Sequence, residues 1–152
     1  MEIHIVLDNI RSAFNVGSIF RSADGAGSVK KIYLCGITAD IDNPKLEKTA
    51  LGALETVDSE HFDSTLEVLE ELKNRNIPIY AIEITKGAKN FQQIQYPERV
   101  ALVLGHEKKG VSDEILSMCD EKIMIPMRGF KESLNVANCA SIILYEITRN
   151  SN

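Results

Sequence analysis

The chain alternates short apolar runs with segments of helical periodicity, and this alternation restricts the fold more than any other feature of the sequence. The runs are rich in aliphatic residues and too short for buried helices, so they fit strands that are covered on both faces. Strands are predicted at residues 3–7, 31–34, 78–83, 100–104 and 122–125, with a weaker one near 55–57. Strands that alternate with helices usually form a parallel sheet, which predicts an α/β fold with helices flanking a mostly parallel sheet.

Two helices are predicted before the last strands. The first begins at Asn15, a favourable N-cap residue, and ends at the glycines Gly25 and Gly27. It carries one apolar stripe at helical spacing, formed by Val16, Ile19, Phe20 and Ala23. The second helix covers residues 64–75, acidic at its start and basic at its end, as the helix dipole favours.

A last helix is predicted over residues 134–149, and its apolar surface is unusually wide. The stripe and the residues that widen it are Val136, Ala137, Cys139, Ala140, Ile142, Ile143, Leu144, Tyr145 and Ile147. A surface of this width usually packs on two sides. One side is expected to cover the sheet, and the other either a neighbouring helix or a second subunit.

The length of 152 residues and the 44% hydrophobic content predict one globular domain over residues 1–152. No apolar run approaches the ~20 residues that span a bilayer, and the first residues lack the pattern of a signal peptide. The cysteines are odd in number and include no C-x-x-C pair, which disfavours disulfides and zinc: Cys35, Cys119 and Cys139. A cytoplasmic protein without membrane contact is the expectation.

The net charge of −5 argues against a general nucleic-acid binder, which usually carries a basic excess. The basic residues nevertheless recur in loops near Gly or Asn: Arg11, Arg21, Lys108, Lys109, Arg128 and Lys131. A basic patch on an acidic body still binds a phosphate backbone, with a strong dependence on salt.

Two polar loops follow predicted strands. In residues 102–112, Gly105 and Gly110 have the spacing of a P-loop, but Val111 stands where that motif requires lysine, which disfavours nucleoside triphosphates. A glycine turn at the carboxyl end of a strand still favours a ligand site. In residues 125–135, Ser133 is the expected N-cap of the last helix and Asn135 a residue of its first turn. The histidines show no metal-ligand spacing, so no metal is expected: His4, His61 and His106.

Three segments together resemble the sequence motifs of the SpoU/TrmH family of SPOUT RNA ribose 2'-O-methyltransferases. Residues 15–17 with 20–27 resemble the first motif, and residues 102–112 resemble the second. Residues 125–127, with 133–136 and on through Glu146, resemble the third. The motifs occur in the family order and cover nearly the whole chain.

The resemblance implies a C-terminal trefoil knot, an S-adenosylmethionine site within it, and a homodimer that joins through the last helix. The cofactor cradle carried over from the family is Ile82, Gly105, Ile125, Met127 and Leu134. The catalytic residues carried over are Arg21, Asn15, Glu107, Ser133 and Asn135. The resemblance implies that Arg21 activates the ribose hydroxyl. Because a guanidinium stays protonated and does not readily act as a base, the alternative is that Arg21 holds the adjacent phosphate and stabilises the developing alkoxide. RNA contacts are expected at Arg11, Lys108, Lys109, Arg128 and Lys131.

The chain resembles the minimal, stand-alone members of the family, one group of which methylates the wobble position of transfer RNA. That group has proline at two positions where this chain has Phe14 and His106. Transfer RNA is slightly preferred over ribosomal RNA as the substrate, since a small dimer suits a compact molecule. Two alternatives stay open: a catalytically inactive RNA-binding module of the same fold, and an enzyme that depends on an accessory protein for RNA affinity.

Overall fold

A computed structural model of the chain describes residues 1–150, so the last two residues of the predicted domain lie outside the described range. Within that range the strands form one seven-stranded sheet in the order β3-β2-β1-β6-β4-β7-β5, and every strand pair is parallel. The strands are β1 (Glu2–Asp8), β2 (Val29–Cys35), β3 (Ser59–Phe62), β4 (Ile79–Ile82), β5 (Lys89–Asn90), β6 (Arg99–Gly105) and β7 (Glu121–Met124). The predicted α/β class with a parallel sheet is confirmed.

The five main strand predictions are confirmed with small shifts at their ends, but the weak strand near residues 55–57 is wrong. That segment lies mostly in the short helix α3 (Ala53–Thr56), and β3 begins at Ser59. Val57 is buried in the core as the residue that ends α3, so its apolar character reflects packing and not a strand. The two-residue β5 was not predicted, because it is too short to leave a hydrophobic pattern.

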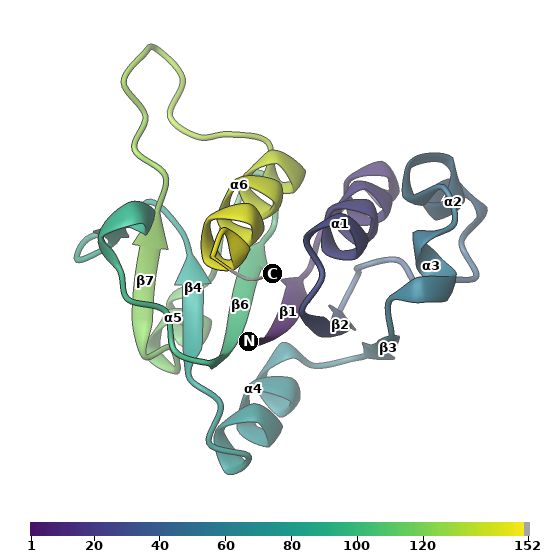
Figure 1. Ribbon diagram of the computed structural model, residues 1–152, viewed down its shortest axis with the longest axis horizontal. Coiled ribbons are helices and arrows are strands. Elements are labelled where there is room, and N and C mark those ends of the chain that lie inside the picture. The colour runs from purple at the N-terminus through teal and green to yellow at the C-terminus, as the bar shows by residue number, and fades with distance from the viewer. Residues whose placement is uncertain (151–152) are drawn as a thin grey trace.

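Helices cover both faces of the sheet (Figure 1). They are α1 (Ala13–Ala26), α2 (Pro44–Ala50), α3, α4 (Thr65–Asn74), α5 (Asp113–Ser117) and α6 (Val136–Thr148), with a 3-10 turn η1 at Phe91–Gln93. The predicted N-cap of α1 is wrong by three residues: Ser12 caps the helix, and its hydroxyl oxygen accepts from the Asn15 N–H at 3.2 Å. Gly25 lies within the helix, and Gly27 alone ends it. The α4 prediction is confirmed, with Ser64 as N-cap.

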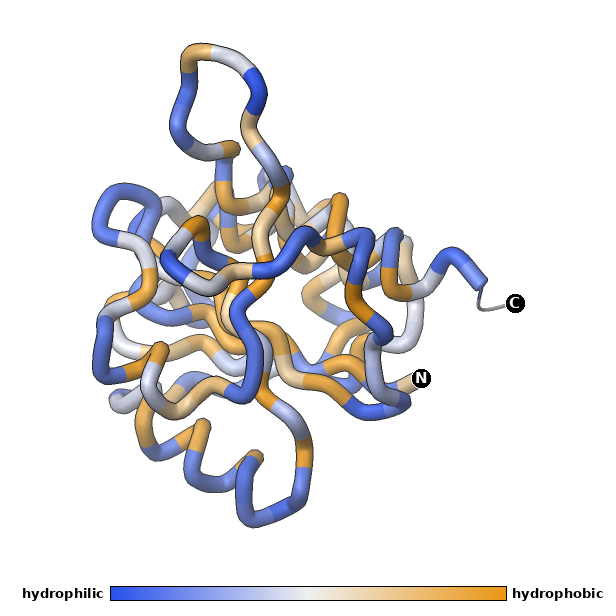
Figure 2. The backbone as a smooth tube through the Cα atoms, turned by 90° about the vertical axis from the view of Figure 1, so that its left-hand side faces the viewer, coloured by the Kyte–Doolittle hydropathy of each residue, from blue (hydrophilic) through white to orange (hydrophobic). Residues whose placement is uncertain are grey.

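Alternate residues of the central strands enter two separate hydrophobic cores. In β1, Ile3, Ile5 and Leu7 pack toward α1, α2 and α6, whereas Val6 packs toward α4 and α5. Figure 2 shows the apolar segments gathered in the interior, while the long segment between β7 and α6 stands out from the body. Since β1 and β6 are buried on both faces, they read as continuous apolar runs and not as alternating ones.

Helix α1 lies between α2 and α6 on one face of the sheet (Figure 1). Gly17 makes the contact with α2 possible, because a Cβ at this position would overlap the Thr49 hydroxyl and the Leu46 carbonyl oxygen. On its other side, the hydroxyls of Ser22 and Ser141 form a hydrogen bond of 2.5 Å between α1 and α6. These two contacts fix α1, whose first turn borders the candidate site described below.

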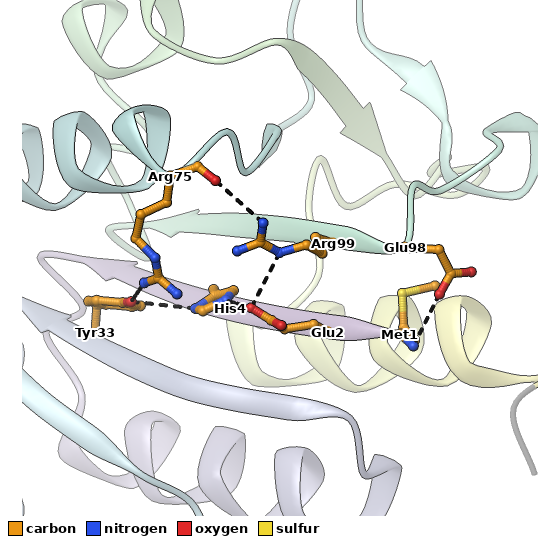
Figure 3. Close-up of polar contacts among 7 residues, drawn as sticks. All are labelled: Met1, Glu2, His4, Tyr33, Arg75, Glu98 and Arg99. Carbon is orange, nitrogen blue, oxygen red and sulfur yellow. Dashed lines mark hydrogen bonds and ion pairs between the residues drawn. The ribbon is translucent and has the colours of Figure 1, made fainter.

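A polar cluster lies at the amino ends of the central strands, formed by Glu2, His4, Tyr33, Arg75 and Arg99 (Figure 3). The His4 ring is almost fully buried, and its Nε2 lies 2.7 Å from Glu2 Oε1. Burial lowers the pKa of His4, against the opposing effect of Glu2. The cluster lies at the edge of the sheet opposite to the loop that follows β6.

The trefoil knot implied by the family resemblance stays a prediction. No helix within residues 1–150 combines the length and apolar character needed to cross a membrane.

Candidate active site

A cavity of about 490 Å³ opens at the carboxyl ends of β4, β6 and β7, between these strands and the first turns of α1 and α6. Its apolar walls are Ile82, Leu104, Ile125, Leu134 and Val136. Parallel α/β sheets place their ligand sites at this edge, because loops from several strands converge there. A cavity of this volume with mixed walls matches the usual dimensions of a small-molecule site.

A tight turn after β6 forms one wall of the cavity. The Gly110 N–H donates to the His106 carbonyl oxygen at 2.8 Å, which closes the turn. A Cβ on Gly105 would lie 2.5 Å from the Gly110 carbonyl carbon, so only glycine allows this close approach. A tight turn is therefore present at Gly105, where the sequence predicts a ligand site, and its first residue exposes backbone without a side chain.

Glu83 holds this turn from the neighbouring strand and was not predicted as a site residue. Its Oε2 accepts from the Val111 N–H at 2.7 Å. Gly110, at φ +67°, leaves no room for a side chain against the Glu83 carboxylate. The sequence signal for Glu83 is a charged residue at the end of the predicted strand 78–83, at the same edge of the sheet as Gly105.

The Glu107 carboxylate joins the turn to the start of α1. Its Oε1 accepts from the Arg11 N–H at 2.7 Å, and its Oε2 accepts from the Ser12 N–H at 2.8 Å and from the Asn15 side-chain amide at 3.2 Å. Partial burial raises the pKa of this carboxyl, but the hydrogen bonds from Arg11, Ser12 and Asn15 outweigh burial and hold the pKa below its ordinary value. The ionised form of Glu107 is therefore favoured, and both of its oxygens accept hydrogen bonds from the start of α1.

The same hydrogen-bond chain continues to the third loop. Asn15 Oδ1 accepts from the Asn135 side-chain amide at 3.1 Å. Asn135 Oδ1 accepts from the N–H groups of Ala137 and Asn138, which makes Asn135 the N-cap of α6. The expected assignment of the N-cap to Ser133 is corrected, because the helix begins two residues later. Ser133 instead contributes to the cavity wall.

The structure gathers ten of the fifteen predicted site residues around one cavity. These are Arg11, Asn15, Ile82, Gly105, Glu107, Lys108, Ile125, Ser133, Leu134 and Asn135. Met127 does not line it, and Met124 occupies the wall instead. Arg128 and Lys131 belong to the protruding segment between β7 and α6, and Lys109 lines a second cavity behind the Gly105–Gly110 turn.

Arg21 is exposed on α1 and does not line the cavity. It lies six residues beyond Asn15, about 9 Å further along the helix axis. Within one copy of the chain, Arg21 is therefore separated from the Glu107–Asn15–Asn135 network.

Single apolar side chains remain exposed on α1 and on α6. Phe14, Ile142 and Tyr145 are all exposed, Tyr145 to 54% of its surface. Tyr145 lies across α1, since a Cβ on Gly25 would be 2.7 Å from its hydroxyl oxygen. The wide apolar face predicted for the last helix is thus only partly covered by the sheet and by α1.

The cavity fits S-adenosylmethionine in size and in chemistry. Apolar walls accept the faces of an adenine ring, and the glycine turn after β6 exposes backbone groups for its hydrogen bonds. Within the described residues, no group of three or more His, Cys, Asp or Glu side chains is placed to hold a metal ion.

Comparison with known proteins identifies the family of the chain. The SpoU rRNA Methylase family model matches residues 2–145. The tRNA (guanosine(18)-2'-O)-methyltransferase of Aquifex aeolicus is 36% identical over 149 residues, which cover 97% of this chain and 69% of that protein.

Solved structures give the same result. The SpoU methyltransferase AviRb from Streptomyces viridochromogenes, in complex with the cofactor AdoMet, superimposes with a TM-score of 0.89 at 30% identity, over 98% of this chain and 57% of that one. A structure described as giving insights into the 2-OH methylation of C/U34 on tRNA superimposes with a TM-score of 0.86 at 27% identity, over 97% of this chain and 95% of that one. The chain belongs to the SpoU rRNA methylase family.

Proposed function

We propose that this chain transfers the methyl group of S-adenosylmethionine to a ribose 2'-hydroxyl of transfer RNA and acts as a homodimer. The observation that carries the proposal is the hydrogen-bond chain from Glu107 through Asn15 to Asn135, which joins all three motif segments at one cavity. A catalytically inactive relative has no reason to retain this connected set of polar groups beside a cofactor-sized cavity.

S-adenosylmethionine supplies an electrophilic methyl group when it is bound. The turn at Gly105 and the walls at Ile82, Ile125 and Leu134 would hold it by shape and by backbone hydrogen bonds. The support is the match to a family whose solved members include AdoMet complexes. Met127, placed in the cradle by the sequence resemblance, does not line this cavity.

The ribose hydroxyl becomes an effective nucleophile only when its proton is drawn away. Glu107 is a poor base, because three donors already occupy its oxygens and hold its pKa low. The Arg21 guanidinium stays protonated and therefore suits the developing alkoxide and the adjacent phosphate. We assign Asn15, Glu107, Ser133 and Asn135 to positioning, and Arg21 to charge stabilisation.

A homodimer reconciles the exposed position of Arg21 with a role in catalysis. Arg21 lies on α1 outside the cavity of its own copy, and the exposed Tyr145 of α6 lies against α1 at Gly25, one turn beyond Arg21. Pairing through this face would bury the apolar side chains and bring Arg21 to the cavity of the partner subunit. The active site would then be incomplete in a monomer.

RNA would approach over the mouth of the cavity, where Arg11 and Lys108 lie. The protruding segment adds Arg128 and Lys131, with the Phe130 ring 93% exposed between them. Cations flanking an exposed aromatic ring suit a backbone with unstacked bases. Transfer RNA is preferred because the first relative described above and the structure that matches this chain in length both concern tRNA. Cytoplasmic location stays a prediction.

The test uses the purified full chain, S-adenosylmethionine with a labelled methyl group, and unmodified transfer RNA or ribosomal RNA. Methyl incorporation into transfer RNA, followed by mapping of the modified nucleotide, is the expected result. Incorporation only into ribosomal RNA would show that ribosomal RNA, and not transfer RNA, is the substrate. Failure to bind S-adenosylmethionine in calorimetric titration would reject the enzyme assignment, and activity without added protein would exclude a required accessory partner.

A further inference from the structure

A second cavity of about 460 Å³ lies on the other side of the Gly105–Gly110 turn. It is lined by the carboxyl end of β1, by Ile37 after β2, and by the first turns of α4 and α5, and it shares His106 and Gly110 with the candidate active site. A ligand in one cavity is therefore separated from a ligand in the other only by this turn.

Asp8 forms the polar centre of this second cavity. The residue ends the central strand β1 and is only 6% exposed. Its Oδ1 accepts from the Thr65 hydroxyl at 2.6 Å and from the Asn9 side-chain amide at 3.1 Å. Its Oδ2 accepts no hydrogen bond from any residue in the range 1–150. This oxygen keeps some accessible surface, and Asp8 lines the cavity. A buried carboxylate thus keeps one acceptor for a ligand.

The surroundings hold this carboxylate in one orientation. Asn9 adopts a left-handed backbone with φ 58°, and its Oδ1 accepts from the Ile37 N–H at 3.0 Å while its amide reaches Asp8. Gly36 allows this arrangement, since a Cβ there would overlap the Asn9 side chain. The acceptor is therefore preorganised, which lowers the cost of binding.

The chemistry of the walls selects the class of ligand. Two carboxylates, those of Asp8 and Glu114, line the cavity and disfavour a phosphate within it, and the described residues hold no cluster of three metal-ligating side chains. Ile37, Leu66 and Ile115 offer apolar walls for the faces of a flat ring. The His106 Nδ1 accepts from the N–H groups of Lys108 and Lys109, so a neutral ring would carry its proton on Nε2 as a further donor. An acceptor, a donor and apolar faces together fit a nucleobase.

We propose that the second cavity binds a nucleobase of the substrate RNA next to the methylated nucleotide, with Asp8 accepting a hydrogen bond from an N–H group of that base. The proposal rests on the proposed function, because a ribose that reaches the first cavity brings its neighbour to the shared turn. Single-stranded RNA is commonly recognised by unstacked bases held in such pockets. Lys109, which also lines the cavity, would contact the phosphate of the same nucleotide.

The decisive variant is Asp8→Asn, which keeps an oxygen for Thr65 and Asn9 but turns an NH2 group toward the cavity. The matched control is Asp58→Asn, an exposed aspartate with the same change of charge. For Asp8→Asn, kcat/KM should fall and the Kd for RNA should rise, each by about tenfold or more, because a hydrogen bond to a charged group is lost. Binding of S-adenosylmethionine and the melting temperature should stay unchanged.

Base preference separates a recognition role from a structural one. Transcripts in which single bases next to the methylated nucleotide lack their exocyclic amino or ring N–H group should bind the wild type more weakly but Asp8→Asn equally. Unchanged RNA affinity and unchanged preference in Asp8→Asn would overturn the proposal. So would tight binding of guanosine monophosphate that depends on Asp8 while RNA binding does not. A wild type that binds RNA through Asp8 yet transfers no methyl group would reject the proposed function and leave this site standing.

Discussion

The Glu107 carboxylate and the Asn15 side-chain amide are hydrogen-bonded at 3.2 Å although 92 residues separate them. This contact ties the turn after β6 to the first turn of α1. Because Asn15 also accepts from Asn135, the same pair fixes the start of α6. One carboxylate, both of whose oxygens accept hydrogen bonds, thus links the segments that border the cavity.

Glu107→Gln should disturb this arrangement with little change in volume. A glutamine presents only one acceptor oxygen, so one of the backbone N–H groups of Arg11 and Ser12 would face an NH2 group. We expect the free energy of unfolding to fall by about 1–2 kcal/mol and methyl transfer to fall more than S-adenosylmethionine binding. Urea denaturation and single-turnover kinetics measure the two effects. Glu70→Gln, on the exposed face of α4, is the control that should change neither.

Arg21→Ala should leave folding and S-adenosylmethionine binding intact while lowering methyl transfer about 100- to 1,000-fold, the usual cost of losing one preorganised charge stabiliser. Arg21→Lys should rescue only part of the rate, since an ammonium lacks the planar donor pair. Lys30→Ala removes an exposed charge at the amino end of β2, away from the cavity at the carboxyl ends of the strands, and serves as control. Wild-type turnover in Arg21→Ala would show that the assignment to Arg21 is wrong.

Gly105→Ala tests the glycine turn as part of the cofactor site. The added methyl group would meet the Gly110 backbone, so the turn must open at a cost of about 1–3 kcal/mol. Affinity for S-adenosylmethionine in calorimetry should fall by about tenfold or more. Gly129→Ala is the matched control, since nothing lies within 4 Å of a Cβ there. Equal affinity in the two variants would remove the turn from the cofactor site.

Tyr145→Glu should abolish the proposed homodimer by placing a charge in its apolar face. Sedimentation would show a monomer, and methyl transfer would be lost while the circular dichroism spectrum stays native. Ile41→Glu changes an equally exposed apolar residue elsewhere and should leave the dimer intact. A wild type that sediments as a monomer with full activity would contradict the two-subunit site.

Because the His4 ring is buried, the stability of the folded chain should depend on pH in the acidic range. Burial lowers its pKa in the folded chain below the ordinary value of 6.5, so the unfolded chain binds the proton first as the pH falls. The stability contributed by neutral His4 is therefore complete above pH 6.5 and is lost as the pH falls below it, toward the lowered pKa. Melting curves should show this loss for the wild type and for His61→Gln, and a smaller loss for His4→Gln.

The alternation of apolar runs predicted the central strands because β1 and β6 are buried on both faces and need aliphatic residues throughout. The same reasoning failed at Val57, where burial serves the end of a helix, and it could not find β5, which has only two residues. The cap of α1 was misplaced because Ser12 and Asn15 both suit an N-cap, and only the Ser12 hydroxyl accepts from the helix.

The residues that form the candidate site were predicted better than the way in which they are arranged. Asn15, Glu107 and Asn135 were named from motifs that lie far apart in the sequence, and the structure joins them through hydrogen bonds. Asp8, which ends β1, and Glu83, which follows β4, belong to no local sequence motif, and their contacts form only where neighbouring loops meet. The separation of Arg21 from the cavity likewise follows from helix geometry that no motif records.

The central place of β1 also shapes how the chain must fold. The strand pairs with β6 in a register that joins Glu2 to Arg99, so its second partner is synthesised almost a hundred residues later. Pairing between such distant segments must close a large loop before any contact compensates for the lost entropy, which slows folding. A nascent chain that ends before β6 therefore exposes an unpaired, aliphatic β1 edge, and this protein is expected to acquire its native sheet only late in synthesis.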